Sequence, residues 1–161
     1  MLGTGSTPTA RRRRMTIARR RGFWATLLLG AAVMAAVDEI VFHQLLRWHH
    51  FYDRATTEVG LVSDGVLHAL ELVALAAGFF LLADARRRGP VDGMTAWSGF
   101  VIGAGAFQVW DGLIDHKVLR VHQVRYDVEL LPYDVAWVAA GVVLLVLGVL
   151  LRVRASREQA P

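Results

Sequence analysis

Residues 135–151 read VAWVAAGVVLLVLGVLL and contain no polar side chain. A bilayer core about 30 Å thick is crossed by about 20 residues of α-helix, so this stretch and its flanks are long enough to span a membrane. Three further segments are similar: 22–37 and 94–110 carry no charge, and 67–83 contains a single acid, Glu71. The apolar residues are continuous and do not alternate, which favours helices over the strands of a barrel.

The composition agrees with a membrane protein. Hydrophobic residues make up 55% of the 161 residues, and the mean hydropathy is +0.40, more than a soluble domain of this size can bury. The chain has no cysteine, which excludes disulfides, thiolate metal sites and cysteine nucleophiles. The net charge of +4 comes from short arginine clusters between apolar segments, so we interpret the clusters as topology signals and expect no nucleic-acid binding.

The arginine clusters predict the topology. They contain 13 of the 18 basic residues and lie at 11–14, 19–21, 86–88 and 152–157. By the positive-inside rule, both termini and the middle loop are cytoplasmic, and loops at about 49–63 and 117–132 face outward. We therefore expect a flexible Arg-rich cytoplasmic tail (1–21), a membrane domain (22–151, with spans at about 22–48, 64–84, 94–117 and 133–151) and a second cytoplasmic tail (152–161).

The chain contains an internal repeat. Shifting it by 73 residues aligns GAAVMAAVDEIVFHQLLRWHH (30–50) with GAGAFQVWDGLIDHKVLRVHQ (103–123), with 7 of 21 positions identical and a shared pattern D-x4-H-x2-L-R-x-H. The first and third spans run in the same direction. The repeat therefore predicts two parallel helical hairpins related by a pseudo-two-fold axis along the membrane normal, with Asp38 opposite Asp111 and His43 opposite His116.

Polar side chains gather in the outer half of the predicted spans, and all six histidines lie on that side. Buried charges in a membrane are costly unless they pair or bind an ion. Glu39 and His43 are four residues apart and share a helix face. Asp38 and His43 are five apart, roughly 140° around an α-helix, so we expect one of them to contact a neighbouring helix.

We interpret this group as a metal site, because imidazole and carboxylate ligands suit Zn, Fe, Mn or Cu(II), and four-helix bundles hold such ligands in their cores. The candidate ligands are His43, His68, His116, Asp38, Asp64, Asp111 and Asp115. Residues that orient the ligands or replace them are Glu39, Glu71, His49, His50, His122 and Asp134.

Three alternatives stay open. His43 and His116 could ligate one haem iron from two helices, although the dense carboxylates favour a bare cation. The acids and histidines could form a proton or ion pathway. Finally, Asp–His and Asp–Arg pairs could tie the helices together without any ligand. No catalytic residue is recognisable, so the sequence makes no statement about a reaction.

The polar motifs also resemble a known family. DEIVFHQLLRWHH (38–50), DGVLH (64–68), DGLIDH (111–116) and HQVR (122–125), followed by Asp134, are similar to the bacterial membrane-protein family called domain of unknown function 2243. The resemblance covers about residues 22–151. The family's first motif usually reads D-G, whereas Glu39 stands here in place of that glycine. The resemblance implies a small multi-span protein of the bacterial inner membrane and implies no activity.

The sequence therefore predicts an all-α, four-helix transmembrane bundle of two parallel hairpins with both termini in the cytoplasm. Its predicted function is binding of a metal ion in the outer half of the bundle, for metal handling, maturation of a metalloenzyme or redox chemistry. The expected partners are the lipid bilayer and either another membrane protein or a second copy of the chain.

Overall fold

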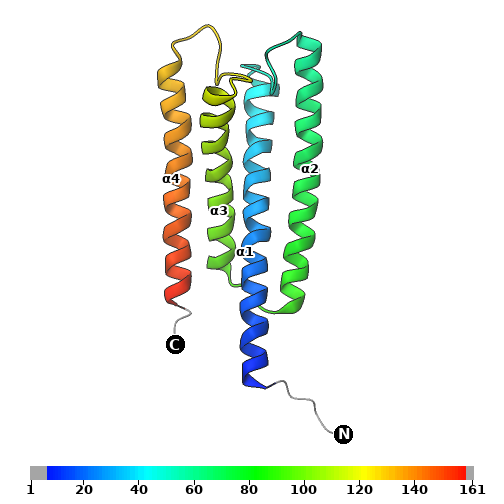
Figure 1. Ribbon diagram of the computed structural model, residues 1–161, viewed down its shortest axis with the longest axis vertical. Coiled ribbons are helices and arrows are strands. Elements are labelled where there is room, and N and C mark those ends of the chain that lie inside the picture. Colours follow the sequence, from blue (N-terminus) through cyan, green and yellow to red (C-terminus); the bar gives the residue numbers. More distant parts are fainter. Residues whose placement is uncertain (1–6, 159–161) are drawn as a thin grey trace.

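A computed structural model describes residues 7–158. Its helices are α1 (Pro8–Asp38), α2 (Thr57–Arg88), α3 (Gly93–Trp110) and α4 (Leu130–Arg157), and the described residues contain no strand. α1 continues into a π-helical segment, η1 (Glu39–Leu45), and α3 continues into a second one, η2 (Asp111–Val118). This confirms the predicted all-helical fold with four long helices (Figure 1).

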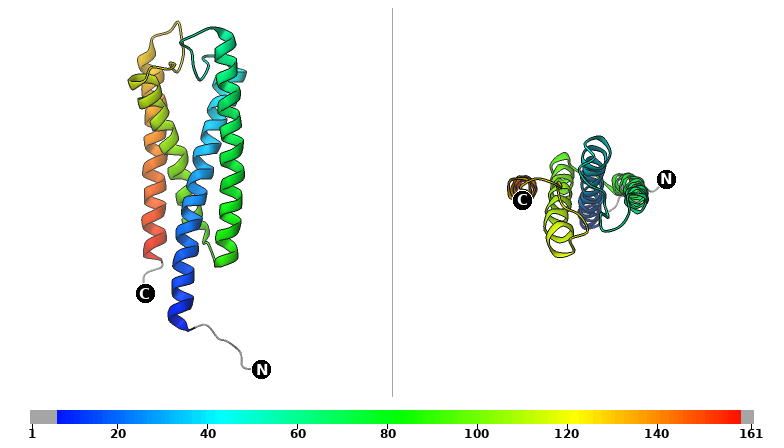
Figure 2. Two further views of the ribbon diagram at one scale, coloured as in Figure 1. Left: turned by 45° about the vertical axis from the view of Figure 1, so that its right-hand side comes forward. Right: turned by 90° about the horizontal axis from the view of Figure 1, so that it is seen from above.

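The helices lie in a row with α1 and α3 at its centre. α1 packs against α2 and α3, while α4 packs against α3 and the adjoining η2. Seen from above, the order across the molecule is α4, α3, α1, α2 (Figure 2). Both ends of the chain and the short α2–α3 connection lie at one end, and the two longer connections lie at the other (Figure 1).

Two glycines allow the central helices to touch. A Cβ atom at Gly30 would overlap the carbonyl oxygen of Phe100, and one at Gly103 would overlap that of Leu27. Both pairs are related by the 73-residue offset of the repeat. Small residues at a helix–helix contact let backbones approach closely, as is typical of membrane proteins.

The burial pattern is inverted relative to that of a soluble protein. The buried apolar side chains are mostly alanines, and large apolar residues on α2 and α4, such as Phe80 at 77% exposure, point outward. An apolar exterior suits lipid, because lipid tails replace the water that such a surface would otherwise order. Within residues 7–158, three helices are long and apolar enough to cross a membrane: Arg12–Leu45, Thr57–Arg88 and Leu130–Arg157.

The structure differs from the predicted spans in two respects. α3 does not meet the hydropathy expected of a spanning helix, because it carries Thr, Ser, Gln and several glycines. The span predicted at 94–117 therefore stays a prediction. α1 begins at Pro8, so residues 8–21, expected as part of a flexible tail, are helical. Proline suits the first helical position, and Ala and Arg are good helix formers. Residues 1–6 of that tail, like 159–161 of the second, lie outside the described residues.

Both π-helical segments end in the same way. Arg47 and Arg120 each have φ 53°, in the left-handed region that ends many helices but that usually takes glycine. In the first half, the amide of Leu46 donates to the carbonyl oxygen of Val41, and the amide of Trp48 donates to that of Phe42. The equivalent bonds of the second half run from Leu119 to Ile114 and from Val121 to Asp115. The turns therefore send the chain across the end of the bundle by the same geometry in both halves.

Candidate metal site

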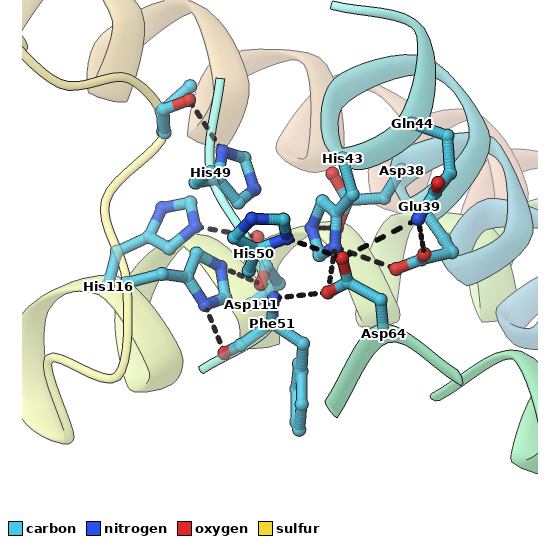
Figure 3. Close-up of polar contacts among 12 residues, drawn as sticks. Asp38, Glu39, His43, Gln44, His49, His50, Phe51, Asp64, Asp111 and His116 are labelled. Atoms are coloured by element: carbon cyan, nitrogen blue, oxygen red, sulfur yellow. Dashed lines mark hydrogen bonds and ion pairs between the residues drawn. The ribbon is translucent and has the colours of Figure 1, made fainter. Parts of the chain in front are cut away.

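Eight polar side chains are buried together at the end of the bundle opposite the termini. They are Asp38, Glu39, His43, His49, Asp64, Asp111, His116 and His122. They come from the end of α1, from η1 and η2, from the two connecting loops and from the first half of α2. The site is therefore built where the two copies of the repeat meet (Figure 3).

The π-helical segments determine which side chains share a face. In a π-helix the backbone hydrogen bond joins residues i and i+5, so side chains five positions apart align. Nε2 of His43 lies 3.6 Å from Oδ2 of Asp38, and Nε2 of His116 lies 3.1 Å from Oδ2 of Asp111. The prediction that one of the two contacts a neighbouring helix is confirmed, because Nδ1 of His43 lies 3.2 Å from Oδ1 of Asp64 on α2. The π-helical winding additionally brings His43 back to Asp38, which an α-helix at this point would not do.

Two histidines of the connecting loops are held by the backbone of the opposite half. Nδ1 of His49 donates to the carbonyl oxygen of Val124 at 2.9 Å, and Nδ1 of His122 donates to that of Phe51 at 2.9 Å. A carbonyl oxygen only accepts, so in both rings Nδ1 carries a proton, and in the neutral ring the lone pair is on Nε2. The rings are stacked with centroids 4.7 Å apart and planes 3° apart.

Two more imidazoles, those of His43 and His116, lie against this stacked pair. Ring centroids are 4.4 Å apart for His43 and His49 and 4.6 Å apart for His116 and His122. In all four rings Nε2 is buried and makes no hydrogen bond within the described protein. We call these four histidines, with Asp38 and Asp111, the histidine centre; Figure 3 shows His43 and His49 beside His116 and Asp111.

The loop histidines experience opposite electrostatic surroundings. Burial, together with the rings of His122 and His43, lowers the pKa of His49 to about 2, so this imidazole is neutral. Burial also opposes a charged His122, but Asp111 beside Nε2 outweighs it and raises the pKa of that ring. Asp111 thus favours a positive charge at Nε2 of His122, whether a proton or a metal ion carries it.

A second group of ligand atoms adjoins the histidine centre. Nδ1 of His43 lies 2.6 Å from Oε2 of Glu39 and 3.2 Å from Oδ1 of Asp64. Asp64 also accepts from Nδ1 of His50 at 2.6 Å and from the amide of Phe51 at 2.7 Å. We call Glu39, Asp64 and Nδ1 of His43 the carboxylate site. His43 therefore faces both groups, with Nε2 toward one and Nδ1 toward the other.

Other predicted candidates lie outside these groups. His68 is half-exposed and pairs with Glu71, whose Oε2 lies 2.9 Å from its Nδ1. Asp134 forms an ion pair with Lys117 at 2.6 Å, and Asp115 is half-buried on η2. No side-chain hydrogen bond or ion pair among the described residues joins them to the eight buried side chains, although Glu71 is itself buried.

Sequence reasoning gave the loop histidines too small a role. His49 and His122 were placed among the orienting residues, yet they lie at the middle of the histidine centre. The signal was present, because His49 and His122 are one of the seven identities of the repeat. The repeat does not predict the path of the two loops, which fold back across the bundle and bury both rings.

Donor atoms in the cluster fit a metal ion. Three buried groups each offer three ligand atoms within 4.8 Å of one another: His43, His49 and His122; Asp111, His116 and His122; and Glu39, His43 and Asp64. Haem fits less well, because His49 lies against His43 and His122 lies against His116. A porphyrin ring would have to displace both loop histidines.

The fold and the site together define an all-helical membrane protein with a buried cluster of histidines and carboxylates at one end. The chain belongs to the family described as predicted membrane protein (DUF2243), whose model matches residues 25–155. The resemblance found in the motifs is thus confirmed, with nearly the expected limits. No curated protein and no solved structure matches the chain.

Proposed function

We propose that this membrane protein binds a transition-metal ion at the histidine centre. The observation that supports the proposal most strongly is the fixed tautomer of His49 and His122. Each ring gives its Nδ1 proton to a backbone carbonyl of the opposite half and turns a buried Nε2 without a hydrogen bond into the cluster. Histidines that ligate metals in proteins are held in the same manner.

The ligands indicate the class of metal. Imidazole suits Zn, Cu and Fe, and the carboxylate of Asp111 adds a hard oxygen donor. The chain has no cysteine, which argues against Cu(I). We therefore propose Zn, Fe or Cu(II) as the ion, with Mn less well matched to an imidazole-rich set.

Location suggests a role in handling metal at the outer side of the membrane. The buried side chains lie at the end opposite the arginine clusters of the sequence, which the positive-inside rule places in the cytoplasm. A metal held there would be reachable from outside the plasma membrane. We propose metal handling or delivery to a neighbouring membrane protein as the activity, and redox chemistry if the ion is Fe or Cu.

Elemental analysis of detergent-purified protein tests the proposal. After equilibration with Zn²⁺ and removal of the excess, we expect near-stoichiometric zinc in the wild type and its loss in His116→Ala. Neither ring nitrogen of His116 makes a hydrogen bond within the described protein, so the substitution removes a ligand and leaves the hydrogen bonds intact. His68→Ala is the matched control, because this histidine lies apart from the centre, and it should retain the metal.

The same hydrogen bonds favour a second candidate function, a structural network. His49 and His122 link the two halves through their bonds to Val124 and Phe51 whether or not an ion is bound. If the folded wild type contained no zinc, iron, manganese or copper, this result would overturn the metal proposal and favour the structural network. Proton-flux measurements would then separate it from an ion pathway.

A further inference from the structure

We infer that the carboxylate site is a second cation site, distinct in ligand type from the histidine centre, and that Glu39 creates it. The inference rests on the proposed metal-binding function and deepens it. Glu39, Asp64 and His43 are buried and each offer one ligand atom within 4.8 Å of the other two; Nδ1 of His43 lies 2.6 Å from Oε2 of Glu39 and 3.2 Å from Oδ1 of Asp64. This trio shares no residue with the trio of Asp111, His116 and His122.

Glu39 directs a carboxylate oxygen into the site. Its side chain is 0% exposed; Oε1 accepts from Nε2 of Gln44 at 2.8 Å, whereas Oε2 makes no hydrogen bond within the described protein and faces Nδ1 of His43 at 2.6 Å. A buried carboxylate is stable only when its charge is paired. A cation bound between Glu39 and Asp64 would pair the charges of both.

The charges in this part of the site lack a permanent counter-ion. The hydrogen bonds and ion pairs of Glu39 and Asp64 join them to Gln44, His43, His50 and the amide of Phe51. No lysine or arginine is among these partners. One divalent cation would neutralise both carboxylates, while His50, with a side chain only 23% exposed, would hold Asp64 in place.

The two halves of the repeat differ at this position. The residue equivalent to Glu39 is Gly112, where a Cβ atom would lie 2.7 Å from Cδ1 of Trp137. The second half therefore has no room for a side chain where the first half supplies a carboxylate. Asp134, which faces the second half, pairs instead with Lys117 at 2.6 Å. The carboxylate site is a feature of the first half alone.

The ligands favour a harder metal than the histidine centre does. Two carboxylates and one imidazole suit Mn²⁺ or Fe²⁺, whereas the imidazole-rich centre suits Zn²⁺ or Cu²⁺. Neutral His43 has a single lone pair, so it serves the oxygen-rich site through Nδ1, and Asp111, His116 and His122 remain as ligands for the nitrogen-rich ion. We therefore assign a mixed pair of ions, an oxygen-rich one near α2 and a nitrogen-rich one between the halves.

The experiment counts metal ions per chain. Detergent-purified protein is loaded first with one equivalent of Zn²⁺ and then with an excess of Mn²⁺, because zinc in excess would occupy both sites. It is then freed of excess and measured by elemental analysis and by the electron paramagnetic resonance of bound Mn²⁺. We expect two ions in the wild type, one zinc and one manganese. Glu39→Gly, which copies the residue of the second half, and the isosteric Glu39→Gln should each lose manganese and keep zinc.

Glu71→Gln is the matched control. Glu71 is a buried carboxylate whose hydrogen bond joins it to His68 and not to Glu39, Asp64 or His43, so the variant should keep both ions. One zinc and no manganese in both the wild type and Glu39→Gln would overturn the second site and leave the proposed function standing. Two ions retained in Glu39→Gln would also overturn it. No metal in the folded wild type would overturn the proposed function itself.

Discussion

At the scale of single residues, the site depends on atoms whose roles are fixed by their neighbours. His49 and His122 have the same chemistry as His68, yet only the first two are buried, fixed in one tautomer and turned toward other ligands. Their role follows from the carbonyl groups of Val124 and Phe51. A histidine becomes a good ligand when its second nitrogen is occupied by a backbone acceptor.

Replacing either loop histidine should also destabilise the protein without any metal. His122→Ala would leave the carbonyl oxygen of Phe51 without its donor, and an unsatisfied buried polar group costs about 1–3 kcal/mol. We expect a loss of that size in the free energy of unfolding of the metal-free protein, measured by thermal unfolding in detergent. An unchanged stability would show that the bond contributes nothing.

Arg47 gives a second prediction at this scale. Its φ of 53° costs a residue with a Cβ about 1–2 kcal/mol, and a β-branched residue tolerates it worst. Arg47→Gly should therefore leave the free energy of unfolding unchanged or slightly higher, while Arg47→Val should lower it. Equal stability of the two variants would argue against the left-handed turn that ends η1.

At the scale of elements, the contact between α1 and α3 depends on glycine. Gly103→Ala would drive a Cβ atom into the carbonyl oxygen of Leu27, and overpacking of this kind costs about 1–3 kcal/mol. Gly65→Ala is the control, because a Cβ there meets nothing within 4 Å and alanine stabilises a helix by about 0.5–1 kcal/mol relative to glycine. We expect melting temperatures to move in opposite directions.

The π-helical segments are the element that sequence reasoning missed. The D-x4-H pattern was read as an α-helix, which separates Asp38 from His43. The i→i+5 winding brings them together, and it does so again for Asp111 and His116. Propensity and periodicity do not distinguish the two windings over seven or eight residues, whereas packing of the polar ends against each other does.

At the scale of the molecule, the topology is testable because the chain has no cysteine of its own. Thr56→Cys and Ser156→Cys place a single exposed thiol at opposite ends of the bundle. With the predicted orientation, a membrane-impermeant maleimide should label the first variant in intact cells and the second only after lysis. The reverse pattern would invert the topology and place the metal site on the cytoplasmic side.

The reciprocal contacts of the two halves bear on the predicted duplication. His49 with Val124 and His122 with Phe51 are equivalent pairs at the 73-residue offset, as are Gly30 with Phe100 and Gly103 with Leu27. Such pairs are what a two-fold relation requires. The rotation itself stays a prediction, and an experimental structure should superpose the hairpins by a turn near 180°.

The sequence by itself determined the helical membrane class, the family and the gathering of polar residues at one end. These properties follow from hydrophobic length, from motif order and from the cost of charges in lipid, all of which depend on local composition. Only the tertiary structure decided which polar atoms face one another. The π-helical winding, the path of the two loops across the bundle and the direction of Glu39 into the carboxylate site arise from packing between segments far apart in the chain, and local patterns do not encode that packing.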